Sequence, residues 1–386
     1  MSEEKLVPKL RFSGFDDEWN EDYLNKLFDN RNERNFENLE VLSVTINDGV
    51  LKRSDLGSDR KNKDKKSMKH VLKGDLVYNP MFMWKGASGI SSYEGITSAD
   101  YIVLKSKNNV NPIFFSHLFQ TEKSLNKFKN YSQGSLLERL RLMYPQFSDI
   151  KMAFPSYEEQ EKIANLLTSV DNKIELIEKK YQTYLDFKKY LMQQIFTQKL
   201  RFNFNDTWKT VKIKDIFDER SEKGFLDLEL LSVTLNDGVI KRSEIESKDN
   251  SNENKSNYKH VLPGDIVYNS MRMWQGASGV SPYEGIVSPA YTILIPKNVY
   301  SKYFGYYFKT NEMVYQFKKY SQGLTSDTWN LKYPLISEIK IKIPSIEEQK
   351  EITNVFEIMD EKIKILQNNI DELTTFKKGL LQQMFV

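Results

Sequence analysis

An internal repeat constrains the fold of this chain more than any other feature of its sequence. The second half of the 386 residues restates the first half at an offset of 189 or 190 positions. Residues 69–79 return as 259–269 with two substitutions, and residues 131–134 return unchanged as 320–323. The length also exceeds the size at which one hydrophobic core normally stops growing, so the repeat predicts two equivalent structural units.

The first part of each copy has the residue pattern of short β-strands. β-Branched and aromatic residues dominate segments 41–46 and 71–78, and Asn-Asp-Gly and Gly-Asp turns interrupt this pattern. The same strands and turns recur in the second copy. We therefore predict an α+β fold in which each copy forms a globular domain of mainly antiparallel strands.

Each copy then changes to a helical period. Ser156 and Ser345 are each followed three residues later by a glutamate, which predicts a capping box at the start of a long helix. Apolar residues then recur at alternating steps of four and three, the spacing of a coiled-coil seam. The seam contains Ile163, Leu167, Val170, Ile174 and Ile177 in the first helix and Ile352, Phe356, Met359, Ile363 and Leu366 in the second.

Two lysines indicate how the long helices are arranged. Lys188 and Lys377 interrupt both seams at the same register, so we predict that the helices pair with each other. An antiparallel pair makes the chain an internal pseudo-two-fold repeat. The predicted boundaries are residues 1–155 for the first globular domain, 156–198 for the first helix, 199–344 for the second domain and 345–386 for the second helix.

Composition narrows the chemistry that the chain can perform. Cysteine is absent and histidine occurs three times, which excludes disulfides and disfavours a Cys/His zinc site. The net charge of +3 is weaker than that of many nucleic-acid binders, so charge alone does not identify DNA as the partner. No apolar run is long enough to cross a bilayer and residues 1–12 lack a signal core, so we predict a cytoplasmic protein with no membrane partner.

An enzymatic alternative depends on residues 79–82. Their sequence, Asn-Pro-Met-Phe, resembles the Asn-Pro-Pro-Phe loop with which amino-methyltransferases hold a target base. The second copy reads Asn-Ser-Met-Arg at 269–272, without the proline, and neither copy has the glycine-rich strand-to-helix turn that cradles a nucleotide cofactor. We therefore favour a chain that binds no cofactor and carries no catalytic or metal site of its own.

Several residues have both a structural and a functional interpretation. His70, His260 and His117 lack the spacing of metal ligands and are interpreted as surface or strand residues. Met83, Trp84 and their repeat partners are either core or contact residues, and for the two tryptophans the core is favoured. The basic run between residues 60 and 69 is either a solvated loop or a phosphate-contacting loop. A further alternative is a coiled-coil adaptor whose arms bind proteins. Salt-dependent binding to duplex DNA would distinguish a DNA-binding protein from such an adaptor.

The ordered set of repeated motifs closely resembles the specificity subunits of type I restriction-modification systems, over essentially the whole chain. The motifs are Pro-Ser-x-Glu-Glu-Gln at 155–160 and 344–349, Phe-Lys-Lys at 187–189 and 376–378, and the two Tyr-Ser-Gln-Gly loops. The resemblance implies two target-recognition domains, each of which reads one half of a split site in double-stranded DNA. It also implies that the helices set the gap and bind two methyltransferase subunits, while two restriction subunits complete the nuclease.

The same resemblance assigns the chemistry to the partner subunits, which use S-adenosylmethionine, ATP and Mg2+. Family members often have two dissimilar recognition domains, whereas these two are alike through most of their length, which indicates related half-sites. The candidate positions on the subunit-binding helices are Ile163, Val170, Ile174, Ile177, Ile352, Met359, Ile363 and Leu366.

A DNA reader must offer hydrogen-bonding groups to base edges while cations and amides hold the phosphates. The copies diverge between residues 135–141 and 324–330, where we expect the half-sites to differ. The candidates for phosphate or base contact are Lys52, Arg53, Lys241 and Arg242, which follow the Asn-Asp-Gly turns. The candidates for base edges are Asn79, Asn269, Gln133 and Gln322, joined in the divergent segments by Arg139, Arg141, Thr325 and Asn330.

Overall fold

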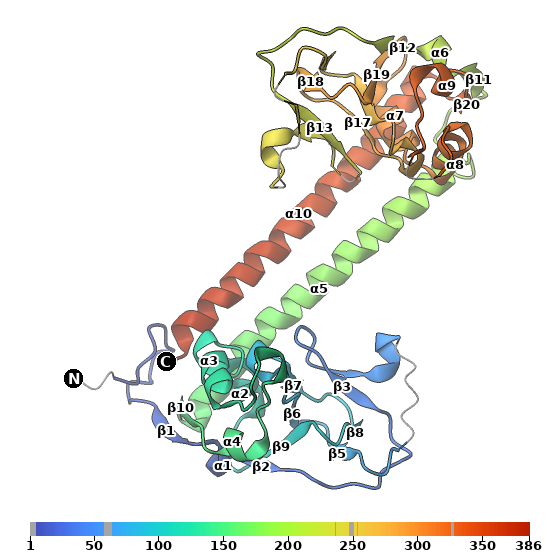
Figure 1. Cartoon of the computed structure of the whole chain (residues 1–386). Coiled ribbons are helices and arrows are strands. Elements are labelled where there is room, and N and C mark those ends of the chain that lie inside the picture. The colour runs from blue at the N-terminus through green and yellow to red at the C-terminus, as the bar shows by residue number, and fades with distance from the viewer. Residues whose placement is uncertain (1–4, 58–63, 236, 247–250, 253, 326–327) are drawn as a thin grey trace. The chain divides into compact units, whose positions relative to one another are not determined.

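The chain divides into two compact units in the computed structural model (Figure 1). The first unit contains Met1–Glu178 together with Asn368–Val386, and the second contains Lys179–Gln367. Each unit therefore combines one globular domain with the start of one long helix and the end of the other. The structure describes residues 5–57, 64–235, 237–246, 251–252, 254–325 and 328–386.

The first unit is organised around a four-stranded antiparallel sheet of order β2-β9-β6-β7. These strands are β2 (Phe28–Asn30), β9 (Ile102–Ser106), β6 (Leu76–Tyr78) and β7 (Ser88–Ile90). Two-stranded sheets join β1 (Asn20–Tyr23) to β10 (Lys151–Phe154), β3 (Leu42–Val44) to β4 (Val50–Lys52), and β5 (Lys69–Val71) to β8 (Gly95–Thr97). The short helices are α1 (Leu24–Leu27), α2 (Pro112–Leu118), α3 (Glu122–Tyr131) and α4 (Tyr144–Ser148), with 3-10 turns η1 (Arg53–Leu56), η2 (Met83–Lys85) and η3 (Leu137–Arg139).

The second unit repeats this plan with a sheet of order β12-β19-β16-β17. Its strands are β12 (Phe217–Arg220), β19 (Tyr291–Pro296), β16 (Ile266–Asn269) and β17 (Ser278–Val280). The smaller sheets pair β11 (Lys209–Lys212) with β20 (Lys340–Ile343), β13 (Leu231–Thr234) with β14 (Gly238–Lys241), and β15 (Lys259–Val261) with β18 (Gly285–Val287). The short helices are α6 (Ile213–Ile216), α7 (Ser301–Tyr307), α8 (Asn311–Tyr320) and α9 (Tyr333–Ile336), with η4 (Arg242–Glu244) and η5 (Met273–Gln275). The predicted α+β repeat with antiparallel strands is confirmed.

The two long helices are α5 (Tyr157–Phe196) and α10 (Ile346–Met384). In the first unit, Ile163 and Leu167 of α5 pack in the same core as Leu380 and Met384 of α10. In the second unit, the start of α10 and the end of α5 share a core in the same way. Full burial of an aliphatic side chain stabilises a fold by roughly 1.5–3 kcal/mol, so the seams anchor the helices to both domains. Within the described part of the chain, no helix has the length and apolarity needed to cross a membrane.

The lysines that interrupt the seams form ion pairs between the helices. Lys377 of α10 lies 2.6 Å from the carboxylate of Asp171 on α5 in the first unit. Lys188 of α5 pairs with Asp360 of α10 in the second unit. The predicted pairing of the helices is confirmed, and each ion pair holds the start of one helix beside the end of the other.

The predicted capping box is wrong in its second half. The hydroxyl of Ser156 accepts a hydrogen bond from the backbone of Glu159 at 3.4 Å, as an N-cap does. The Glu159 carboxylate is buried and accepts two hydrogen bonds from Arg11, at 2.7 and 2.8 Å. A buried carboxylate requires a charged partner, and Arg201 supplies the same pair of bonds to Glu348 in the second unit.

Candidate nucleic-acid interface

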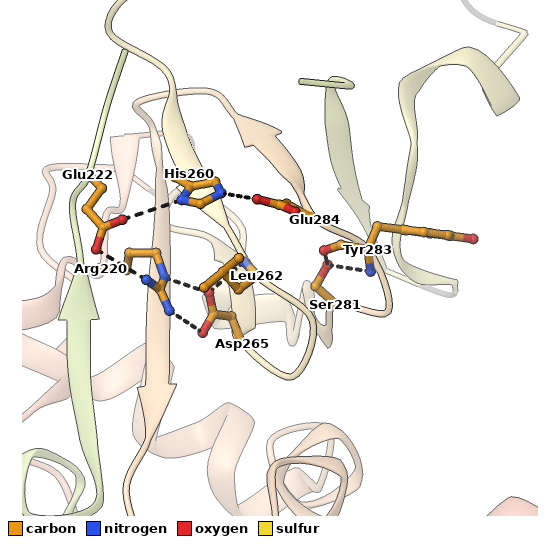
Figure 2. A network of polar contacts seen from close by, with 8 residues as sticks. All are labelled: Arg220, Glu222, His260, Leu262, Asp265, Ser281, Tyr283 and Glu284. Carbon is orange, nitrogen blue, oxygen red and sulfur yellow. Dashed lines mark hydrogen bonds and ion pairs between the residues drawn. The ribbon is translucent and has the colours of Figure 1, made fainter. Parts of the chain in front are cut away.

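The repeated Lys-His-Val-Leu segment is held by a polar network in each unit. Figure 2 shows His260 between Glu222, 3.4 Å from the histidine Nδ1, and Glu284, 2.9 Å from Nε2. Arg220 donates two hydrogen bonds to Asp265, and these bonds raise the pKa of the guanidinium. His70 has the same two glutamate contacts in the first unit, from Glu33 and Glu94.

These histidines are structural. The ring of Phe225 stacks on His260 at 3.9 Å, and Phe36 stacks on His70 at the same distance. The contacting glutamates are distant in sequence, so the spacing near each histidine gives no sign of them. His117 differs from the prediction, because it is a buried residue of helix α2. Among the described residues, no cluster of histidine and carboxylate groups could hold a metal ion.

The candidate lysines at the ends of β4 and β14 already have partners. Lys241 lies 3.1 Å from Glu229 and over the ring of Tyr283, whose backbone amide is bonded to Ser281 in the network of Figure 2. The hydrogen bond to Glu229 raises the pKa of the Lys241 amine. Lys52 makes the equivalent contacts, 3.4 Å from Glu40 and over the ring of Tyr93. Both lysines are partly exposed, and an ammonium group has three donors, so either lysine can contact a phosphate while it stays paired with its glutamate.

The candidate arginines next to them are also bonded within the fold. Arg53 donates to the hydroxyl of Ser43 at 3.2 Å, and Arg242 donates to the carbonyl of Ile245 at 3.0 Å. Burial raises the pKa of the Tyr101 phenol, and the charge of Arg53 opposes that rise. The phenol also accepts a 3.4 Å hydrogen bond from the side chain of Asn79. The structure therefore brings the candidates Arg53 and Asn79 into one neighbourhood.

The first of two candidate surface loops, which we name loop A, comprises residues 79–86 and its repeat 269–276. The side-chain oxygens of Asn79 and Asn269 accept the backbone hydrogen bonds of Met81 and Met271, at 3.1 and 3.0 Å. Such Asx turns fix the start of the loop and occupy the amide oxygen. Met83 and its repeat Met273 are fully buried and belong to the domain cores.

The second candidate loop, loop B, comprises residues 133–142 and its repeat 322–331. Gln133 and Arg141 exchange two backbone hydrogen bonds, at 3.0 and 2.9 Å, and Gln322 and Asn330 do the same at 3.0 and 2.8 Å. The glycine after each glutamine allows this closure, because a Cβ at Gly134 would lie 2.5 Å from the carbonyl oxygen of Arg139. The side chains of Gln133, Arg139, Arg141, Gln322 and Thr325 are exposed, whereas Ser326 and Asp327 lie outside the described residues.

Loops A and B are bonded to each other in both units. The backbone amide of Leu142 donates to the carbonyl of Pro80 at 3.0 Å, and Leu331 donates to Ser270 at 2.9 Å. We call each joined pair the two-loop surface. It unites Asn79, Gln133, Arg139 and Arg141 in the first unit and Asn269, Gln322, Thr325 and Asn330 in the second. The oxygen of the Asn330 side chain is buried without a hydrogen-bond partner in the described structure, so it is not offered to a base edge.

Aromatic side chains with lysines over their rings lie on this surface, whereas the sequence interpretation placed the repeated tryptophans in the domain core. Trp84 is half-buried, and the amines of Lys85 and Lys129 lie 4.8 and 5.8 Å from its ring centre. In the second unit, Trp274 contacts Trp329 edge to face, and Lys318 lies over the Trp329 ring. Lysines near the loops add positive charge to this surface, and positive charge favours contact with the phosphates of DNA. The tryptophan at the same place in both copies of loop A was the available signal, and a lysine follows it only in the first copy, at Trp84-Lys85.

The basic run at 60–69 is only partly described. Arg60, Lys61 and Lys63 lie outside the described residues. Lys69 is buried and donates to the carbonyl of Tyr101 at 2.7 Å, so it holds the fold together. Lys65 and Lys66 lie close to Glu37, within the same domain.

The candidate residues of the long helices face the interior of each unit. Ile163, Val170, Ile352, Met359 and Leu366 are buried, and Ile174, Ile177 and Ile363 are half-buried. Other apolar side chains are exposed, including Leu176 at 68% and its repeat partner Ile365 at 50%. Phe187 and its partner Phe376 are exposed at 49% and 55%. In the second unit a pocket of about 240 Å³ is lined by Thr183, Tyr184, Phe187, Ile358, Met359 and Lys362.

Comparison with other proteins identifies relatives of the whole architecture. The MjaVIII specificity subunit of a type I restriction enzyme, from Methanocaldococcus jannaschii, is 24% identical over 337 residues, or 78% of this chain and 76% of that protein. A putative MjaX specificity subunit from the same organism is 22% identical over 364 residues, or 87% of this chain and 84% of that protein.

Solved structures have the same fold. The S subunit of a type I restriction-modification system from M. genitalium has a TM-score of 0.61 at 14% identity, covering 98% of this chain and 99% of that one. The HsdS subunit from Thermoanaerobacter tengcongensis has a TM-score of 0.50 at 14% identity, covering 100% of this chain and 98% of that one.

A family model extends the match to most of the sequence. It is described as "Type I restriction modification DNA specificity domain" and matches twice, at residues 24–183 and 205–375. The two matches fall on the two repeats, and together they cover well over half of the residues. The chain therefore belongs to the family of DNA specificity subunits of type I restriction-modification systems.

Proposed function

We propose that this chain, a non-catalytic specificity subunit, reads a two-part site in duplex DNA, with one part read by the two-loop surface of each unit. The observation that carries the proposal is the duplication of that surface. Both copies have the same backbone bonds between loops A and B, yet their exposed side chains differ. Two related but distinct half-sites can be recognised by one loop scaffold that carries different side chains in each unit.

Base and phosphate contacts divide between the candidates according to their surroundings. Gln133 and Gln322 are exposed on loop B and offer both a donor and an acceptor to base edges. Lys52 and Lys241 are ion-paired at the domain surface and serve as phosphate contacts. Lys85, Lys129 and Lys318 add positive charge beside the loops. Phosphate contacts supply affinity without sequence information, whereas base-edge contacts supply the specificity.

The long helices provide the attachment for two methyltransferase subunits. Phe187 and Ile365 are exposed in the second unit, and their repeat partners Phe376 and Leu176 are exposed in the first. Large apolar side chains that are exposed on a helix are candidates for a protein interface. An equivalent pair of such side chains in each unit fits two copies of one partner. The buried seam residues then support the helices without contacting the partner.

The chemistry lies in the assembled cytoplasmic complex. The methyltransferase subunits use S-adenosylmethionine, and two restriction subunits use ATP and Mg2+ to complete the nuclease. This chain positions the partner subunits on the DNA, because its own residues bind the DNA site and the other subunits.

Exchange of loop B between the units tests this proposal. Residues 135–141 and 324–330 are swapped in the full chain, which is co-expressed with its methyltransferase subunit, and methylated positions are mapped in the host DNA. We expect the wild-type complex to methylate a two-part motif and the swapped chain to assemble normally but recognise altered bases. An unchanged motif in the swapped chain would place specificity elsewhere, and a wild-type complex without sequence preference would refute the proposed function.

A further inference from the structure

Arginines on the two-loop surface differ from most other arginines in the chain. Arg11, Arg31, Arg201 and Arg220 are paired with carboxylates, and Arg53 and Arg242 are hydrogen-bonded to a hydroxyl and a carbonyl. Within the described residues, four guanidinium groups have neither a hydrogen bond nor an ion pair. They belong to Arg34, Arg139, Arg141 and Arg272, and all four residues are exposed.

Three of these four arginines lie on the two-loop surface, but on different loops of the two units. Arg139 and Arg141 belong to loop B of the first unit, where the second unit has Thr328 and Asn330. Arg272 belongs to loop A of the second unit, where the first unit has Phe82. The backbone bonds between the loops are equivalent in the two units. The two units therefore have the same loop scaffold but carry their guanidinium groups on different loops of it.

The arginine side chain has a specific partner on duplex DNA. Its planar fork of donors matches the O6 and N7 acceptors of guanine in the major groove, and this contact discriminates against other bases. Lysines already supply charge beside the loops, so phosphate binding alone does not explain why arginine is placed there. An exposed guanidinium without an intramolecular partner is available for a base edge without breaking a bond in the protein.

We propose that Arg139 and Arg141 in the first unit, and Arg272 in the second, read guanine at positions that are not equivalent in the two half-sites. The first half-site has guanine where the DNA faces loop B, and the second has guanine where the DNA faces loop A. The inference rests on the proposed function, and it adds the base identity and the residues that determine it. Asn330 does not replace the arginine contact, because its amide oxygen is buried.

Substitution by lysine separates base reading from phosphate binding. Arg139→Lys with Arg141→Lys, and separately Arg272→Lys, keep each charge but remove the two-pronged donor geometry. The full chain is co-expressed with its methyltransferase subunit, and the motif is derived from methylated positions across the host genome. Arg34→Lys is the matched control, since Arg34 is also exposed and unpaired in the described structure but lies outside the two loops.

We expect each variant to lower the preference for guanine by roughly tenfold or more in one half-site and to leave the other half-site unchanged. Phe82→Arg should add a guanine preference to the first half-site at the position that faces loop A. The Arg34 control should preserve the motif.

Two outcomes overturn the inference while leaving the proposed function intact. One is a wild-type motif that lacks guanine in either half-site. The other is an unchanged motif in both lysine variants, with or without weaker overall methylation, which would show that these arginines bind phosphate. If the wild-type complex methylates without a two-part motif, the proposed function itself fails.

Discussion

His117 of α2 and Tyr306 of α7 occupy equivalent positions, and each lies beside the aspartate that pairs with a seam lysine. Tyr306 donates a 2.7 Å hydrogen bond to Asp360, the partner of Lys188. His117 interacts electrostatically with Asp171 and its partner Lys377 in the first unit. Burial lowers the pKa of His117 to about 4, with Asp171 opposing the shift and Lys377 adding to it. The buried imidazole is therefore neutral at pH 7.

The first unit should lose stability in mild acid because of this histidine. The unfolded chain takes up the proton near pH 6.5 and the folded chain only near pH 4, so stability falls as the pH falls between these values. Between pH 7 and 4.5 the loss should be roughly 2 kcal/mol. Denaturant titrations at both pH values give the free energy of unfolding of wild type and His117→Tyr. We expect this loss in wild type and not in the variant. Tyr306→His should bring acid sensitivity to the second unit, and equal pH dependence in all three proteins would contradict the assignment.

Removal of Arg11 should destabilise the first unit more than removal of its whole ion pair. Arg11→Met leaves the buried carboxylate of Glu159 without a charged partner, at a cost of roughly 3 kcal/mol. Arg11→Met combined with Glu159→Gln removes the buried charge as well, so part of the stability should return. Thermal denaturation of the two variants and wild type measures both effects. If the double variant were the less stable one, the buried charge would not be the cause.

Gly134→Ala should disable reading of the first half-site without unfolding the protein. The added Cβ would lie 2.5 Å from the carbonyl oxygen of Arg139, and the backbone there cannot rotate away as a side chain can. Loop B must therefore open, and methylation of the motif should fall by at least about tenfold, the effect of losing one good base contact. Gly379→Ala on α10 is the control, since its Cβ meets no atom within 4 Å. Equal methylation by both variants would show that the closed loop is not needed.

A fragment of residues 1–200 should fold and form a dimer. It lacks Leu380 and Met384, which cover Ile163 and Leu167 in the first unit. A second copy of the fragment offers Leu191 and Ile195, which stand at the repeat positions of the missing residues. A two-fold pair makes that contact self-complementary. With methyltransferase present, the dimer should direct methylation to an interrupted palindrome. Sedimentation as a folded monomer would argue against the exchange.

Local features of the fold were predictable, and long-range polar contacts were not. The seam at Ile163 and Leu167 follows from spacing within one helix, so its position and the pairing of the two helices were predicted correctly. The Arg11–Glu159 pair joins residues 148 positions apart, and the repeat marks both residues without linking them. Local rules therefore assigned Glu159 to a capping box that it does not form.

The candidate interface was predictable to the same extent. The repeat and its divergence identified loop B, because a difference between two copies is visible in one sequence. The contact between loops A and B is a backbone hydrogen bond from Leu142 to Pro80, which requires no particular side chain. Side-chain identity also does not reveal whether an arginine is already bonded. Arg53 and Arg141 look alike in sequence, but only the guanidinium of Arg53 has a hydrogen-bond partner within the described fold.

The composition of the two units sets the order in which they can be completed on the ribosome. The second unit, Lys179–Gln367, is one continuous stretch, whereas the first requires Asn368–Val386 from the other end of the chain. The first unit therefore begins to emerge first but is completed last. The apolar face at the start of α5 stays uncovered while almost two hundred further residues are synthesised. Exposed apolar surface of this kind favours aggregation during synthesis. The nascent chain should accordingly depend on chaperones during this interval, until its final helical turns emerge.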